Sequence, residues 1–268
     1  MEAFKESFMQ YALIGGILTA GLCAYIGVYL ILKRIIFVGI ALAEVAALGV
    51  AIGLFLGFSP TIAALATTII VVMLFWLSAD VYTLPRESVI ALAYCLAASL
   101  AIILIVKNPM AEAMGINLIS GNLLYINSFD LWTIGGIAVL VTALHMMFFR
   151  EFIFVSFDKE TAQAQGIRAN LYDFLIYLSI GVVVAGAIKI AGVLFVFAAL
   201  VVPPMIGLIL SLKTKYIFLV SSFVAMVGVP IGLWISYKWD FPSAPIIVCI
   251  YCGFYLCMLL MGRVFSGN

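Results

Sequence analysis

Charged side chains are scarce in this sequence. Asp, Glu, Lys and Arg make up 9% of its 268 residues, whereas hydrophobic residues make up 67%. The mean hydropathy is +1.31. A soluble protein of this size does not need so many apolar residues to form its core, so a soluble enzyme or binding module is excluded. The formal net charge of +1 also argues against a nucleic-acid partner. The composition predicts an all-α membrane protein that crosses the bilayer many times.

Residue types that build catalytic or metal sites are also rare. The sequence has one histidine and five cysteines. The cysteines all fall in apolar segments, where they are better explained as small buried hydrophobic residues than as a disulfide framework. No Gly-x-x-x-x-Gly-Lys-Ser/Thr phosphate loop occurs, so any nucleotide must be hydrolysed by another polypeptide and this chain is not expected to be an enzyme. The cysteines are Cys23, Cys95, Cys249, Cys252 and Cys257.

Apolar runs of near-spanning length fill the chain. Each is close to the ~20 residues that a helix needs to cross the bilayer core. Lys189 alone separates two of these runs, so one of the two could be a half-span or a re-entrant helix. We therefore predict about eight to nine transmembrane helices in a single domain, 1–268. The runs are 11–32, 35–56, 61–78, 88–106, 131–149, 171–188, 190–210, 217–236 and 244–261.

The distribution of basic residues predicts the orientation, because Lys and Arg are enriched on the cytoplasmic side of membrane proteins. With the N-terminus outside and the C-terminus inside, nine of the 13 basic residues are cytoplasmic. The other four lie outside. The cytoplasmic set is Lys33, Arg34, Arg86, Arg150, Lys159, Arg168, Lys213, Lys215 and Arg263, and the outer set is Lys5, Lys107, Lys189 and Lys238.

The polar stretch 150–173 interrupts the apolar runs and lies in the cytoplasm in this orientation. Its centre, 158–166, predicts a short amphipathic helix at the membrane face, with Gly166 as a left-handed C-cap. Its small residues would allow a soluble partner to pack closely against it. We interpret this stretch as the contact for such a partner.

Two further patterns concern helix packing. Gly49, Gly53 and Gly57 recur at four-residue spacing, which allows the backbones of neighbouring helices to approach closely in lipid. Pro203 and Pro204 remove backbone donors from the run 190–210 and should kink or break that helix.

Five segments along nearly the full chain carry a recognisable set of motifs. They are Arg34 with 39–44 and Gly49; 118–124 with Asp130 and Leu131; Asp158, 160–162 and Gly166; 192–194 with 200–203; and Gly232, Ser236, Tyr237, Asp240 and Pro242. In this order and spacing the chain resembles the membrane permeases of bacterial ATP-binding-cassette importers for zinc, manganese and iron.

The resemblance implies a multi-pass permease of the bacterial cytoplasmic (inner) membrane, which works by alternating access. It implies a permease dimer, two cytoplasmic ATPase subunits, and a periplasmic or lipid-anchored solute-binding protein. The transported species would be a divalent metal ion, with no cofactor bound by this chain. Asp158, Glu160, Ala162 and Gly166 would form the coupling helix that contacts the ATPase.

One segment departs from the family pattern. The permeases usually carry an Asp and, four residues later, a His in the second helix, where this chain has Ile40 and Glu44. A single carboxylate is a poor zinc site, because tetrahedral zinc favours several ligands. Which metal is carried, and whether the cargo is a metal at all, therefore stays open, as does the choice between a homodimer and a heterodimer.

Glu44 is our candidate for a metal ligand, because an acid about 14 Å inside a span is tolerated only with compensation. The alternative is a structural Glu that is protonated or hydrogen-bonded. His145 lies only about 6 Å deep, so it is a second candidate for which packing is the better explanation.

Two other functions remain open. The first keeps the architecture but moves a chelated or organic substrate along a mostly apolar pathway, which suits the missing Asp/His pair. The second is a secondary transporter that uses Glu44 as a proton site; it leaves the coupling-like loop unexplained.

Overall fold

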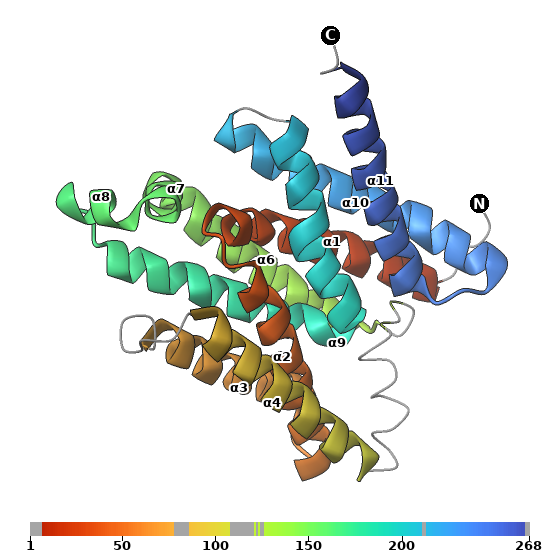
Figure 1. Ribbon diagram of the computed structural model, residues 1–268. Coiled ribbons are helices and arrows are strands. Elements are labelled where there is room, and N and C mark those ends of the chain that lie inside the picture. The colour runs from red at the N-terminus through yellow and green to blue at the C-terminus, as the bar shows by residue number, and fades with distance from the viewer. Residues whose placement is uncertain are drawn as a thin grey trace.

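The computed structural model is an assembly of helices, and the structure describes residues 7–77, 86–107, 121, 123, 126–210 and 213–265. No strand occurs among these residues. The fold is shown in Figure 1. The helices are α1 (Ser7–Leu32), α2 (Ile36–Leu56), α3 (Pro60–Leu77), α4 (Arg86–Val106), α6 (Ser128–Met147), α7 (Phe149–Phe157), α8 (Lys159–Ala164), α9 (Ala169–Leu210), α10 (Thr214–Trp239) and α11 (Ser243–Phe265).

In this part of the chain, eight helices are long and apolar enough to cross a membrane. Two, α7 and α8, are too short, and together they occupy the polar stretch between α6 and α9. The prediction of an all-α protein with eight to nine spans is confirmed. The runs predicted as 171–188 and 190–210 form the two halves of α9, a stretch of 42 residues that is interrupted by a kink at Gly192, and this explains why the number was ambiguous.

The sharp bend in α9 lies at Gly192. This residue has φ 77° and ψ 166°, a backbone conformation that is essentially restricted to glycine. Pro203 and Pro204, which we expected to kink or break the run, lie within the helix, and Gly192 is the residue with non-helical dihedral angles. Prolines are tolerated inside membrane helices where neighbouring groups compensate for the missing hydrogen bonds.

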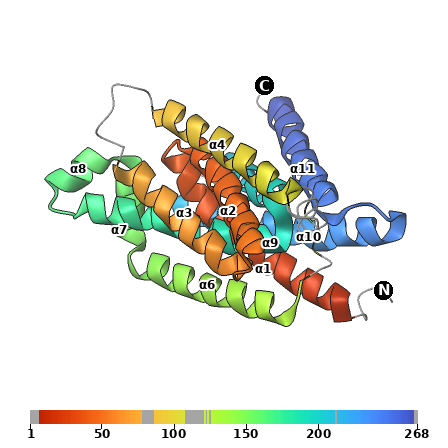
Figure 2. The same cartoon turned by 90° about the horizontal axis from the view of Figure 1, so that it is seen from below.

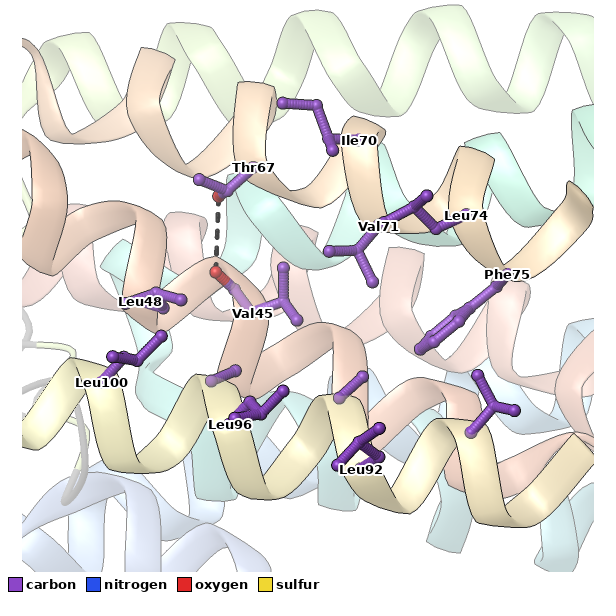
Figure 3. A pocket seen from close by; sticks show the side chains of 13 residues that line it. Val45, Leu48, Thr67, Ile70, Val71, Leu74, Phe75, Leu92, Leu96 and Leu100 are labelled. Atoms are coloured by element: carbon purple, nitrogen blue, oxygen red, sulfur yellow. Dashed lines mark hydrogen bonds between the residues drawn. The ribbon is translucent and has the colours of Figure 1, made fainter. Parts of the chain in front are cut away.

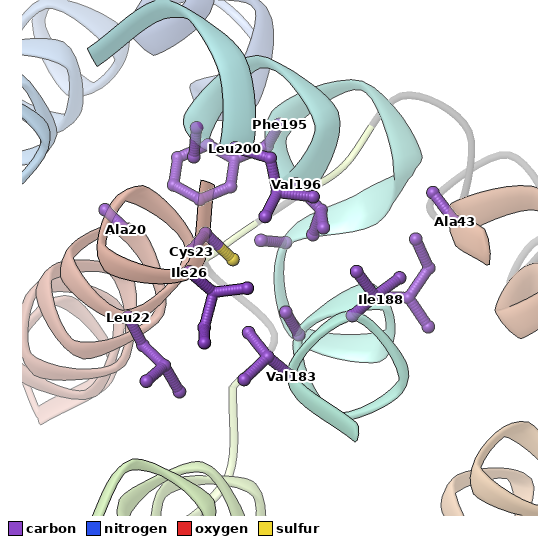
Figure 4. Packing of buried hydrophobic residues seen from close by; sticks show 14 of the residues in the cluster. Ala20, Leu22, Cys23, Ile26, Ala43, Val183, Ile188, Phe195, Val196 and Leu200 are labelled. Carbon is purple, nitrogen blue, oxygen red and sulfur yellow. The ribbon is translucent and has the colours of Figure 1, made fainter. Parts of the chain in front are cut away.

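The core lies where α1 packs along both halves of α9. Figure 4 shows Cys23 and Ile26 of α1 facing Val183 in the first half and Leu200 in the second. Because Pro204 has no N–H, the carbonyl of Leu200 lacks its helical donor. This carbonyl points at Gly27, where a Cβ would overlap it. Glycine at position 27 thus makes room for a carbonyl that proline has freed.

Helix α2 lies between α3 and α4 (Figure 2). A Cβ at Gly49 would come within 2.5 Å of the Cα of Ala64 on α3, and a Cβ at Gly53 within 2.8 Å of the Cα of Pro60. These two glycines therefore permit the close approach that their spacing predicted. Gly57 instead ends α2 in the left-handed conformation, with φ 74°.

Polar contacts gather at two opposite ends of the helices. At one end, Lys33 after α1 and Lys159 at the start of α8 both bind Asp173 near the start of α9. At the other end, Lys189 just before the bend binds Asp130 in the first turn of α6. Which of these ends faces the cytoplasm stays a prediction, as does the N-out, C-in orientation.

The contact between Gly27 and Leu200 generates a prediction about stability. Gly27→Ala should lower the free energy of unfolding by about 1–3 kcal/mol, because the added methyl group must displace the α9 backbone. The matched control is Gly136→Ala, which adds the same group to α6 where nothing lies within 4 Å. The control should be neutral or stabilising by up to ~1 kcal/mol. Thermal unfolding in detergent compares the two; equal midpoints would contradict the packing described.

Candidate functional site

The short helix α8 begins at an N-cap formed by Asp158. The Oδ1 atom of Asp158 accepts a hydrogen bond from the backbone N–H of Thr161 at 3.0 Å, and Oδ2 accepts one from the Thr161 hydroxyl at 2.5 Å. These bonds from Thr161 lower the pKa of the Asp158 carboxyl below its ordinary value. Because the pKa of Asp158 is lower in the folded protein than in the unfolded chain, its ionised carboxylate stabilises the cap at pH values above the unfolded pKa. This stabilisation is lost as the pH falls through the folded pKa. The cap is therefore intact at neutral pH.

The other end of α8 closes with a Schellman motif around Gly166. The N–H of Gly166 donates to the carbonyl of Gln163 at 3.0 Å, and that of Ile167 donates to the carbonyl of Ala162 at 3.1 Å. Gly166 has φ 82°, which confirms the predicted left-handed C-cap. A Cβ here would meet nothing within 4 Å, so the glycine is required by its backbone angle and not by space.

One face of α8 is anchored and the other is free. Ala162 is fully buried against Val155 and Ala169. The Nζ atom of Lys159 lies 2.9 Å from Asp173 Oδ2. Glu160 is exposed, and Asp158, not Glu160, caps the helix. The result is a rigid six-residue helix that presents an exposed face.

Sequence reasoning missed the ion pairs at Asp173. Lys33 Nζ lies 2.5 Å from Asp173 Oδ1, and the Asp173 side chain is only 8% exposed. Both lysines therefore hold one buried carboxylate, which joins α1, α8 and α9. Sequence placed Asp173 in the polar stretch 150–173, but it gave no signal for a partner 140 residues away.

Glu44 lies on the more open stripe of a mostly buried helix. Its neighbours Ala43 and Val45 are buried, whereas Ile40, Glu44 and Leu48, at intervals of one turn, are half-buried. No hydrogen bond or ion pair of Glu44 with another described residue occurs. The carboxylate that was predicted inside a span is thus accessible from one side of α2.

His145 is packed inside the protein. It is fully buried, its Nε2 lies 3.0 Å from Ser179 Oγ, and its ring stacks on Phe152 at 4.3 Å between centroids. Tyr29 meets the ring edge-on at 4.9 Å. These partners lie on α1, α7 and α9, and Glu44 on α2 is not among them. The packing role that we favoured for His145 fits these contacts.

The described residues hold no group of three or more His, Cys, Asp or Glu side chains that could bind a metal ion. An apolar hollow of about 440 Å³ lies between α2, α3 and α4. Its lining includes Leu48, Leu74 and Leu96 (Figure 3). The polar side chain in its lining is Thr67, whose hydroxyl oxygen lies 3.0 Å from the carbonyl oxygen of Ala63 in its own helix and 3.4 Å from that of Val45 on α2. The hollow therefore has no ligand for a cation.

Two expectations need correction. Lys189, which the sequence placed between two separate runs on the outer side, lies inside α9 and pairs with Asp130 Oδ1 at 2.7 Å. The expectation that all five cysteines are buried holds for Cys23 alone. The other four are free thiols on exposed helix faces: Cys95, Cys249, Cys252 and Cys257.

The motif that includes 118–124 falls mostly outside the described residues. Of this segment, Gly121 lies against the carbonyl of Ala191, and the N–H of Leu123 donates to Ser243 Oγ at 3.1 Å. These contacts place Gly121 and Leu123 beside the bend of α9 and the start of α11.

The chain is similar to known proteins over nearly its full length. MntC of Halalkalibacterium halodurans, a manganese transport system membrane protein, is 26% identical over 249 residues, which are 93% of this chain and 85% of that protein. MntC of Listeria monocytogenes, also a manganese transport system membrane protein, is 28% identical over 247 residues, which are 92% of this chain and 88% of that protein. The structure is also similar to PsaBC from Streptococcus pneumoniae in complex with Fab, with a TM-score of 0.87 and 22% identity over 96% of this chain and 93% of that one. The model of the ABC 3 transport family matches residues 5–262, so the chain belongs to this family.

Proposed function

We propose that this chain is the permease subunit of an importer for a divalent transition-metal ion, driven by a separate ATPase subunit and supplied by a solute-binding protein. Its relatives MntC from two bacteria are named as manganese transport proteins, which makes manganese the first ion to test. The observation that carries the proposal is Glu44, a carboxylate without a described partner on the open stripe of α2.

The position of Glu44 suits contact with a cation. An ionised carboxylate within a span is costly unless water, a cation or a partner compensates its charge. Oxygen ligands suit manganese better than the soft sulfur ligands that select other metals. By the resemblance described above, Glu44 also occupies a position where this family usually has a histidine.

One Glu44 is an incomplete ligand set, so a second copy of the chain belongs to the proposal. If two chains are related by a two-fold axis and the open stripes of their α2 helices face that axis, their two Glu44 side chains lie along one pathway. The half-buried state of Glu44, which has no described partner within its own chain, supports this arrangement.

Coupling to the ATPase is assigned to α8. The helix is capped at both ends, is fixed to α9 through Ala162 and Lys159, and leaves Glu160 exposed. A helix held in this way can transmit a displacement to α9 without unwinding. In the proposed cycle, ATP closes the ATPase subunits, α8 moves, and the pathway opens toward the other side.

A chelated metal is the second candidate cargo. By the resemblance described above, Ile40 stands where this family usually has an Asp, and the neighbours of Glu44 on the open stripe, Ile40 and Leu48, are apolar. A substrate that brings its own ligands would need fewer from the protein.

Glu44→Gln tests the role of the carboxylate. This change keeps size and hydrogen bonding but removes the charge, so manganese uptake should fall about tenfold or more, equivalent to ~1.4 kcal/mol. Glu44→Asp keeps the charge and should retain most of the uptake. The measurement is uptake of manganese and zinc into proteoliposomes that contain permease, ATPase and binding protein. Wild-type uptake of both ions by Glu44→Gln would make Glu44 structural and favour the chelated cargo.

Gly166→Val tests the coupling helix. A β-branched residue at φ 82° costs about 1–2 kcal/mol, a factor of roughly 5–30 in the population of the closed cap. We expect the stimulation of ATP hydrolysis by loaded binding protein to fall about fivefold or more. Gly166→Asn is the matched control, because asparagine tolerates the left-handed conformation. If both variants are stimulated like the wild type, α8 is not the coupling element.

A further inference from the structure

A second hollow lies beside α8, between the end of α6, α7 and the start of α10. Its volume is about 830 Å³, which is within the range of sites for organic ligands and far larger than a single ion requires. The start of α10 reaches the same end of the molecule as α7 and α8 (Figure 1). The hollow is lined by Met146, Met147, Phe149, Arg150, Glu151, Ile153, Phe154, Phe157, Gln165 and Lys215.

The floor of this groove is apolar and open. Met146 is 73% exposed and Met147 is 76% exposed, and both belong to the last turn of α6, a helix long enough to cross a membrane. Phe157, at the end of α7, is 62% exposed. Long apolar side chains at the end of a span are positioned to contact lipid chains and not water.

The rim of the groove carries two free cations. Arg150 on α7 and Lys215 on α10 are exposed, and neither forms an ion pair with any residue that the structure describes. Glu151 is the one acidic residue of the lining, so the lining has a net positive charge. Basic pockets between membrane helices attract the phosphate groups of anionic lipids. A metal cation is disfavoured here, since the two positive side chains would repel it.

We propose that this groove binds one anionic phospholipid. Its phosphate lies between Arg150 and Lys215, and its acyl chains cover Met146 and Met147. The lipid would link α7 to the start of α10 next to Gln165, the residue that follows α8. This site is distinct from Glu44 and from the exposed face of α8, and it does not depend on the nature of the cargo.

Retention of lipid by the purified full-length chain tests the site. The protein is equilibrated with mixed phosphatidylglycerol and phosphatidylcholine, and the bound lipid is counted by native mass spectrometry. The wild type should retain one phosphatidylglycerol in preference to phosphatidylcholine. The double variant Arg150→Gln/Lys215→Gln should reduce this preference about tenfold, since each cation near an anionic surface contributes to binding.

A matched control separates a site from general attraction. Arg168→Gln/Lys213→Gln removes the same charge from exposed residues that lie near the same end of the molecule but outside the lining, and it should leave the preference unchanged. An equal loss in both double variants would overturn the proposal in favour of unspecific electrostatics. Release of the lipid on addition of the ATPase subunit would also overturn it, because the groove would then be a protein-docking surface. Unchanged retention in Arg150→Gln/Lys215→Gln would overturn it directly.

Discussion

Asp173 holds three elements of this protein together at one end. Its carboxylate is nearly buried, and it is met by Lys33 from the end of α1 at 2.5 Å and by Lys159 from the start of α8 at 2.9 Å. Removing one partner of a buried ion pair typically costs about 3–5 kcal/mol, because the remaining charge is left uncompensated. The position of α8 therefore depends on a charge that belongs to the core helix α9. The local caps at Asp158 and Gly166 keep α8 helical, but the Lys159–Asp173 pair and the burial of Ala162 decide where it lies.

The first half of α9 connects this end to the other. It carries Asp173 near its start and Lys189 just before the bend at Gly192, where Lys189 binds Asp130. Gly121 packs against the carbonyl of Ala191 at the same bend. A displacement of α8 thus has a contiguous physical route, through the first half of α9 with an ion pair near each end, to Gly121 at the bend. This arrangement is the structural basis of the coupling through α8 that we propose.

Much of the fold could be predicted because hydrophobic length and turn chemistry are local signals. The spans, the glycine contacts of α2 and the C-cap at Gly166 were all found in this way. The two runs were separated at Lys189, close to the kink at Gly192, whereas Pro203 and Pro204, which were expected to kink or break the run 190–210, lie within the helix. The site was predicted less completely. Glu44 and the coupling loop were identified from residue type and resemblance, and their roles stay predictions. The pairs Lys33–Asp173 and Lys189–Asp130 join residues far apart in sequence, for which a single sequence carries no signal.

Hydrogen exchange of the α8 amides tests most directly whether Asp173 fixes the position of α8. In the purified full-length protein, Asp173→Asn should speed exchange in α8 and in the last turn of α1, since both lysines lose their partner. Lys159→Met should speed exchange in α8 alone, and the double variant should add little to the effect of Asp173→Asn in α8, because the two residues share one interaction. Protection of α8 equal to the wild type in Asp173→Asn would contradict the account.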